Sequence, residues 1–435
     1  MVKKVVIVGA GPSGVLLAHY LLDRGEQYQV ELYDRLGDPR VIEFSNARTY
    51  SITLTERGMN ALRQIPRIEA AVRAMGIELQ GGVFHDQRGK TRVTSRKKRL
   101  VAIDRTRLVI ALLKELTEKY DDRRLKLRFN HSCTEVDFAA KTVTFQTSEP
   151  TDSTSTENYD LLIGADGARS AVRCAIASQP NFHNTNLFEL EQKYHPINYK
   201  SIYLPRPTSE TYLDLTRLHT WRTKEGTSVL LVPQQDGSLN GVILFSRQDN
   251  QVTDLTTSEA VLQFFHQHFP EVGQLLPVSE AEAFLKRPPA RVLTIRCSHY
   301  HYGDSVLILG DAAHSVPPSL GQGCNAALED VVIVNQLLDE YAENWKSAVA
   351  QFTLRRKPDA HALLELSNHS SPSSSKQFFE FIIREQLAKI LHRLLPNRFP
   401  PSYFELVFES SVPYSEILQT YKGWIAKVKK SNQPF

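Results

Sequence analysis

This chain has few cysteines, no long apolar run and no marked excess of one charge. Its four cysteines lie far apart and form no C-x-x-C pair, which argues against a zinc module and predicts reduced thiols and no metal site. No run approaches the roughly eighteen apolar residues that a membrane-spanning helix needs, so we expect no transmembrane segment. Lysine and arginine outnumber aspartate and glutamate by only 52 to 48, a balance that argues against a nucleic-acid partner.

The length of the chain and its first residues limit the classes of protein to which it can belong. Because 435 residues exceed one ordinary core and 41% of them are hydrophobic, we expect a globular protein of two or more domains. The sequence enters an apolar strand almost at once, without an apolar leader or a small-residue cleavage site. We therefore expect a cytoplasmic protein.

A glycine-rich turn dominates the first 34 residues. An apolar strand over 5–8 leads into Gly9-Ala10-Gly11-Pro12-Ser13-Gly14, and a helix is predicted over 15–22. In such a G-x-G-x-x-G turn the first glycine permits the bend, the second lets backbone approach a pyrophosphate, and the third lets helix and strand pack closely. A second strand, 30–33, ends at Asp34, whose carboxylate can accept hydrogen bonds from a ribose. This context predicts a dinucleotide site rather than an ordinary glycine turn.

Two further strand-to-helix junctions follow. An apolar strand after Tyr159 ends abruptly at Asp166-Gly167, and a helix begins through Ser170. Later the strand 305–309 ends at Gly310-Asp311, and the segment 321–325 opens a helix over 326–341. Helix N-termini favour anions, so both junctions predict contact with an anionic or polar ligand.

Alternation and turn residues predict the other elements. The expected segments are a strand over 47–54, a helix over 56–64, a hairpin excursion over 81–103 turning at 86–89, a helix over 106–119, strands over 125–129 and 135–145, a polar hairpin tip or loose loop over 148–157, antiparallel strands over 228–232 and 241–245, and helices from 345 onward.

The three junctions, in this order and at this spacing, resemble those of the flavoprotein aromatic hydroxylases. Within that class the chain is similar to the kynurenine 3-monooxygenases, in the stretches 49–58, 218–221, 321–330 and 391–396 leading to 401–403. The resemblance implies non-covalent FAD, transient reduction by NADPH or NADH, and reaction with O2 to a C4a-hydroperoxyflavin that hydroxylates a small electron-rich aromatic substrate. The flavin would carry the chemistry, and we assign no side chain as a catalyst.

The resemblance also implies an α/β fold: a Rossmann-like FAD-binding domain with an inserted, mostly antiparallel β-sheet substrate domain and a C-terminal helical region. The expected segments are 1–75, 104–180 and 291–345 for the FAD-binding domain, 76–103 for a hairpin of the substrate domain, 181–290 for the substrate domain, and 346–435 for a helical cap.

Several residues acquire cofactor roles through this resemblance. Asp34 would hold the adenosine ribose, Arg105 would lie against the cofactor, and Asp311 would hold the ribityl hydroxyls. Cys324 and Asn325 would lie against the isoalloxazine, where a helix N-terminus stabilises negative charge. The remaining expected cofactor contacts are Gly9, Ala10, Gly11, Pro12, Ser13, Gly14, Arg35, Leu54, Cys133, Asp166, Gly310, Gly321 and Gly323.

The substrate pocket departs from the family pattern. Asn368 and Tyr403 match an asparagine and a tyrosine that hold the amino-acid end of kynurenine, but the family's clamping arginine falls on Gly82. Arg96, at or near the position of a second tyrosine, is the candidate replacement. If Arg96 does not replace the clamp, the substrate is a neutral or larger aromatic compound. Two other classes stay open: a non-hydroxylating flavin reductase or oxidase, and a flavin-binding protein without turnover.

Overall fold

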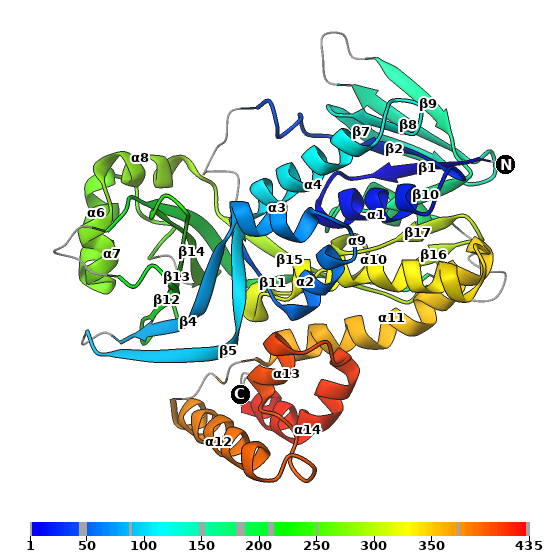
Figure 1. The fold of residues 1–435 in the computed structure, drawn as a ribbon. Helices are drawn as coiled ribbons and strands as arrows, with labels where there is room; N and C mark the ends of the chain where they lie inside the picture. The colour runs from blue at the N-terminus through cyan, green and yellow to red at the C-terminus, as the bar shows by residue number, and fades with distance from the viewer. Residues whose placement is uncertain are drawn as a thin grey trace.

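The structure is a computed structural model that describes residues 2–42, 50–86, 89–147, 153–179, 188–207, 213–248, 251–370, 372 and 375–431. Figure 1 shows three regions: a parallel sheet with its helices, a second sheet beside it, and a group of C-terminal helices below both. This arrangement confirms the expected fold class, an α/β protein with antiparallel sheets and a helical C-terminal region.

The parallel sheet carries the glycine-rich turn. Its order is β16-β17-β10-β1-β2-β6, and only the edge pair β16–β17 is antiparallel. Central strands of a parallel sheet are covered on both faces, which explains why 5–8 and 161–164 are continuously apolar or small and buried. The strands are β1 (Lys3–Val8), β2 (Tyr28–Tyr33), β6 (Leu125–Arg128), β10 (Leu161–Gly164), β16 (His301–Tyr302) and β17 (Val306–Ile308).

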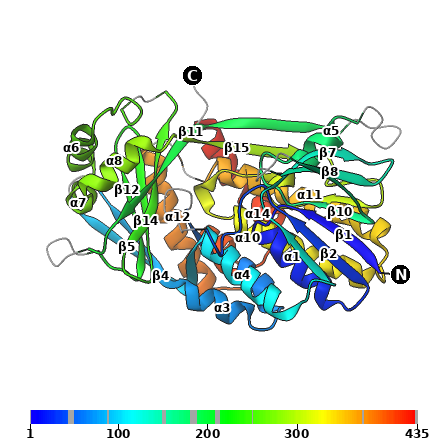
Figure 2. The same ribbon diagram turned by 90° about the horizontal axis from the view of Figure 1, so that it is seen from above.

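Helices and a small sheet sandwich these strands. On one face α1 (Pro12–Asp23) packs between α4 (Arg105–Lys119) and α10 (Gly323–Glu340) (Figure 2). On the other lies an antiparallel sheet of β7 (His131–Asp137), β8 (Thr142–Thr147) and β9 (Thr154–Asn158), beside α5 (Ala171–Ala177). Tyr33 stacks on Phe145 with 3.9 Å between ring centroids, which joins the two sheets. The chain thus covers both faces of the parallel sheet and buries its central strands.

One sequence prediction is wrong in this region. The single strand expected over 135–145 is a hairpin, because the Asp137 carboxylate accepts hydrogen bonds from the N–H groups of Ala139 and Ala140 and turns the chain. The hairpin tip or loose loop expected over 148–157 lies between β8 and β9, which pair antiparallel, so the described residues fit the hairpin alternative, and β9 begins within the segment. Residues 148–152 lie outside the described part of the chain.

The second sheet is mostly antiparallel, with one parallel pair, β12–β4. Its order is β15-β11-β14-β13-β12-β4-β5-β3. These strands are β3 (Ser51–Leu54), β4 (Ile77–His85), β5 (Thr91–Asp104), β11 (Leu190–Leu204), β12 (Arg217–Arg222), β13 (Ser228–Pro233), β14 (Leu239–Ser246) and β15 (Ala290–Cys297). The expected hairpin is the pair β4–β5.

Three helices cover the outer face of this sheet, α6 (Ser258–His268), α7 (Pro270–Leu275) and α8 (Val278–Lys286) (Figure 1). Their apolar side chains, among them Phe265 and Phe284, form a separate core with the sheet residues Trp221 and Ile243. Two short helices, α2 (Glu56–Arg63) and α3 (Ile68–Met75), connect β3 to β4. A second core of this kind is what an inserted domain requires.

The C-terminal helices form a third cluster of buried apolar residues. Helix α11 (Trp345–Asn368) packs on both α10 and α14 (Tyr414–Ser431). Between α11 and α14 come α12 (Ser375–Leu394) and α13 (Tyr403–Glu409), and α9 (Asp311–His314) and the 3-10 turn Pro318–Leu320 precede α10. Among the described residues, no helix is both long enough and apolar enough to cross a membrane. The division into six chain segments stays a prediction.

Candidate cofactor site and substrate pocket

The first two junctions touch through glycine. Gly9 has φ +110°, and a Cβ atom there would lie 2.4 Å from the Ala165 carbonyl oxygen. A Cβ on Gly14 would lie 2.1 Å from the Gly9 oxygen. Both distances are too short for a Cβ atom. Because glycine has none, the first and third glycines of G-x-G-x-x-G allow α1 to lie close to the strands. Helix α1 begins at Pro12, and Gly11 offers no side-chain cap, so N–H groups at this end are available to a phosphate.

Asp34 is fixed beside this turn. Its two carboxylate oxygens accept hydrogen bonds from the N–H groups of Ala10 and Leu36, each at 2.8 Å. Each oxygen keeps a further lone pair, so a ribose hydroxyl could still donate to it. The neighbouring Arg35 side chain is exposed at the end of β2. The structure therefore holds the carboxylate at the turn where the sequence predicted it.

Arg105 brings a positive charge to the same turn. It is the first residue of α4, and a Cβ atom on Gly11 would lie 3.8 Å from its Nη2. The neighbouring Tyr50, followed by the negative charge of Asp311, raises the pKa of Arg105. Burial in turn raises the pKa of Tyr50 to about 12. Arg105 thus lies within electrostatic reach of the first and third junctions.

Asp311 lies at the N-terminus of α10. A Cβ on Gly323, the first residue of that helix, would lie 3.9 Å from Asp311 Oδ1. Burial raises the pKa of Asp311, and Arg105 opposes that effect. The side chains of Asp311 and Arg105 are nevertheless solvent-accessible, although both lie deep in the molecule. Accessible, opposite charges in the interior mark a hollow in which a polar ligand can lie.

Cys324 and Asn325 follow at the same helix end. Burial raises the pKa of Cys324 to about 12, so its thiol stays protonated near neutral pH. The Asn325 amide accepts from Thr55 N–H at 2.8 Å and donates to the oxygens of Thr53 and Gly321 at 2.9 and 3.1 Å. The Asn325 side chain is therefore committed to holding β3 against α10.

The second junction presents an acceptor without a partner. Asp166 Oδ2 accepts from Ala171 N–H at 2.6 Å, whereas the buried Oδ1 has no hydrogen-bond partner among the described residues. Burial raises the pKa of Asp166, and it raises that of the adjacent Cys133 to about 12. A buried unsatisfied carboxylate oxygen is costly, which indicates a missing donor.

Backbone geometry completes the third junction. Gly310 and Gly321 have φ +59° and +61°, so a side chain would strain either position. Gly310 approaches Ser13, since a Cβ on Gly310 would lie 3.1 Å from Ser13 Oγ. Leu54 is buried at the end of β3. The three junctions therefore fit FAD. They combine the accessible Arg105 and Asp311, the uncapped N-terminus of α1 and the unpaired oxygen of Asp166.

Arg96 contacts the C-terminal helix α13. The Arg96 guanidinium lies 4.1 Å from the centroid of the Phe408 ring, and Lys97 on the same strand bonds Glu405 at 3.0 Å. Burial lowers the pKa of Arg96, and the carboxylates of Glu409 and Glu385 oppose that effect. Arg96 is thus flanked by two acids of the chain itself.

Tyr403 lies in the same cluster. It is 1% exposed, its ring packs against Phe381 and Tyr421, and its hydroxyl is buried without a partner among the described residues. Like the Asp166 oxygen, this hydroxyl indicates a missing partner. Arg96 and Lys97 thus bring β5 against α13, the helix that begins at Tyr403.

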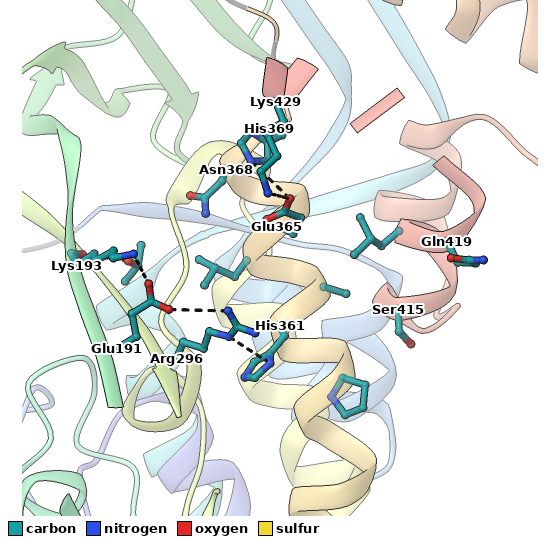
Figure 3. A pocket seen from close by; sticks show the side chains of 15 residues that line it. Glu191, Lys193, Arg296, His361, Glu365, Asn368, His369, Ser415, Gln419 and Lys429 are labelled. Carbon is teal, nitrogen blue, oxygen red and sulfur yellow. Dashed lines mark hydrogen bonds and ion pairs between the residues drawn. The ribbon is translucent and has the colours of Figure 1, made fainter. Parts of the chain in front are cut away.

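Asn368 lies near the C-terminal end of α11, in the wall of a cavity (Figure 3). It lines a cavity of about 630 Å³ between β11, β15, α11 and α14, and neither Arg96 nor Tyr403 lines that cavity. The cavity wall is strongly polar, and Lys193 pairs with Glu191, and Lys429 with Glu365 at 2.9 Å. The role of Asn368 in substrate binding therefore stays a prediction.

Buried polar groups hold the third junction; His314 has the structural, hydrogen-bonded role that its place after Asp311 indicates, whereas the roles of Asp330 and Gln322 were not predicted. Gly310 N–H donates to Asp330 Oδ2 at 2.7 Å, and His314 contacts the same oxygen at 2.6 Å. Gln322, wholly buried before α10, accepts from Tyr414 Oη at 3.0 Å. Asp330 and Gln322 lie in the stretch 321–330, whose resemblance to the family could have drawn attention to them. Tyr199, on β11, lies within electrostatic reach of Arg105 and Asp311, and its sequence surroundings give no such signal.

Comparison with known proteins agrees with this geometry. The family model described as "FAD binding domain" matches residues 3–367. The kynurenine 3-monooxygenase of Drosophila willistoni is 31% identical over 97% of this chain and 90% of its own length. That of Flavobacterium psychrophilum is 30% identical over 96% and 90%. A solved 2-methyl-3-hydroxypyridine-5-carboxylic acid oxygenase superimposes with a TM-score of 0.69 at 18% identity, covering 84% of this chain and 90% of that one.

Proposed function

Because the chain belongs to the FAD-binding aromatic hydroxylase family and is a kynurenine 3-monooxygenase-like, FAD-dependent monooxygenase, we propose that it hydroxylates a small electron-rich aromatic compound other than kynurenine. O2 supplies the oxygen atom, and NADPH or NADH supplies the electrons. The observation that carries the cofactor half of this proposal is the convergence of Arg105, Asp311 and the N-terminus of α10 on one accessible interior space.

The residues of the three junctions have separable tasks in this proposal. The free N–H groups at the start of α1 and the Arg105 guanidinium bind the pyrophosphate, while Asp34 accepts from the adenosine ribose and Asp311 from the ribityl chain. Bound FAD supplies electron transfer from the nicotinamide and activation of O2. The N-terminus of α10, at Gly323 and Cys324, offers positive potential to a negatively charged ring. The neutral Cys324 thiol adds no opposing charge.

The substrate half of the proposal rests on Gly82 and Arg96. Gly82 lies in β4 and has no side chain to present, and its N–H and C=O are both bonded to Thr94 Oγ1, at 3.2 and 3.1 Å. Phe408 lies beneath the Arg96 guanidinium, and the charges of Glu409 and Glu385 act on it from the chain itself. A substrate carboxylate would have to compete with these acids. The wall therefore supports a substrate that carries no amino-acid carboxylate to be clamped.

Oxygen stoichiometry tests the reaction, and a substrate panel tests the specificity. Kynurenine, anthranilate, aromatic amino acids and simple phenols are each added to the holoenzyme, and the rate of flavin reduction by NADPH and NADH is recorded. The true substrate should accelerate reduction, and one equivalent each of nicotinamide and O2 should be consumed per hydroxylated product. Peroxide as the sole oxygen product with every compound would contradict the proposed reaction.

A further inference from the structure

Helix α12 carries a row of exposed apolar side chains. They are Phe379, Ile383, Leu387, Ile390 and Leu394, with exposed fractions of 66%, 44%, 51%, 54% and 70%. At about 100° per residue these five positions fall within an arc of about 80° on the helix surface. We call this set the α12 stripe. Proteins that work as free monomers rarely leave such a continuous apolar face to water.

The opposite face of α12 is already used by the fold. Phe381 is 4% exposed and stacks on Trp424 of α14, with 5.6 Å between ring centroids. The buried Glu385 carboxylate accepts from Tyr403 N–H at 3.0 Å, at the start of α13. These contacts anchor the helix and turn the α12 stripe outward. Figure 1 shows α12 at the lower edge of the molecule, on the outside of the C-terminal helices.

Apart from Glu380, whose carboxylate pairs with Arg384 and Lys427, the charge around the α12 stripe is positive. Between 386 and 404 the chain contains Lys389, Arg393 and Arg398 and no aspartate or glutamate. Arg393 and Arg398 are exposed, and the exposed Leu395 and Phe399 extend the apolar surface past the end of the helix. An apolar stripe flanked by basic side chains is the pattern of a helix that lies in the interface of an anionic bilayer.

We propose that the α12 stripe docks on the surface of an anionic lipid membrane, with α12 lying along the membrane plane. The basic side chains then face lipid phosphates while the five apolar side chains enter the headgroup region. A second copy of the chain fits less well, because a two-fold contact through the stripe would bring the same basic side chains of both copies together. A surface contact needs no spanning helix, and none is found among the described residues.

Vesicle cosedimentation of the full-length holoenzyme tests this proposal. The probes are phosphatidylcholine vesicles with and without phosphatidylglycerol. The wild type should sediment with the anionic vesicles and be released by high salt, because screening weakens the basic contacts. The double variant Leu387→Glu/Ile390→Glu should bind at least about tenfold more weakly, because it places carboxylates in the apolar stripe. Lys389→Gln/Arg393→Gln should weaken binding to anionic vesicles alone.

A matched control separates the stripe from exposed leucine in general. Leu354 on α11 is 62% exposed and lies outside the stripe, so Leu354→Glu should bind vesicles as the wild type does. Flavin absorbance and melting temperature show that each variant is folded. Equal vesicle binding by wild type and Leu387→Glu/Ile390→Glu would overturn the proposal. A wild type that does not bind vesicles would also overturn it. This includes the case in which the wild type elutes as a dimer and the double variant as a monomer.

Discussion

Asp330 and Arg356 form an ion pair inside the protein, with Arg356 Nε donating to Asp330 Oδ1 at 2.6 Å. Both side chains are almost wholly buried. Burial raises the pKa of Asp330, but His314 and Arg356 outweigh it and hold that pKa below its ordinary value. The other oxygen of Asp330 accepts from Gly310 N–H at 2.7 Å, immediately before Asp311. The pair therefore supports the loop that carries the predicted ribityl contact.

Removing Arg356 should destabilise the protein strongly. Arg356→Met leaves the Asp330 charge buried without its partner, which costs about 3–5 kcal/mol of unfolding free energy. Urea unfolding followed by tryptophan fluorescence measures the loss. The control is the adjacent Arg355→Met, because Arg355 pairs with Glu340 at the surface, with side chains 42% and 47% exposed. That change should cost about 1 kcal/mol or less. Equal losses in the two variants would refute the role assigned to the buried pair.

Loss of Asp311 should release the cofactor. Asp311→Ala removes a charged acceptor in the cofactor hollow, and a hydrogen bond to a charged group contributes about 1.5–3 kcal/mol, equivalent to roughly 10- to 150-fold weaker FAD binding. The purified variant should be pale, and fluorescence titration with FAD gives the change in Kd. Asp121→Ala, at an exposed aspartate that pairs with Arg123, should stay yellow. A fully yellow Asp311→Ala protein with unchanged Kd would remove Asp311 from the site.

The altered wall of the substrate pocket predicts poor use of kynurenine. Gly82→Arg has room at Cβ, where the nearest atoms lie 3.5 Å away, and it restores a guanidinium. A charged hydrogen bond of about 1.5–3 kcal/mol should lower the KM for kynurenine about tenfold or more and raise that of a neutral substrate. Gly82→Leu adds bulk without charge and controls for crowding. Efficient kynurenine turnover by the wild type that survives Arg96→Ala would contradict this account.

A buried histidine should make the protein sensitive to acid. His19 is 1% exposed, and its Nε2 lies 2.8 Å from the Leu112 carbonyl oxygen. Burial lowers the pKa of His19 from 6.5 to about 4. The unfolded chain therefore binds a proton more readily, so this stabilising contribution is complete above pH 6.5 and is lost as the pH falls toward 4. The loss is on the order of 3 kcal/mol.

Urea unfolding between pH 7.5 and 4 checks this pH dependence. His19→Gln keeps a side-chain donor for Leu112 and removes the titration, so its unfolding free energy should fall less steeply with acid. His392→Gln is the control, because His392 is only half-buried on the C-terminal helices. Parallel pH profiles for wild type and His19→Gln would show that His19 does not contribute.

The sequence was sufficient to predict the three junctions, because each depends on local chemistry: glycine where a Cβ would clash, and an acid at a strand end. The hairpin in place of the strand 135–145 could not be predicted, since β7 pairs with β8 through a turn that lacks glycine and proline. The pairing of Asp330 with Arg356, and the use of the Asn325 amide by β3, depend on segments far apart in the chain. The position of Asn368, in the wall of a cavity between β11, β15, α11 and α14, likewise depends on segments far apart in the chain.

The most direct test of the central claim is turnover of the identified aromatic substrate under isotopically labelled O2 with FAD-loaded protein and NADPH or NADH. Mass spectrometry of the product counts the labelled atoms, and a peroxide assay measures uncoupled reduction. The account predicts one labelled oxygen atom per product molecule, with nicotinamide consumed one for one. Stoichiometric peroxide with no label in any aromatic compound would contradict it.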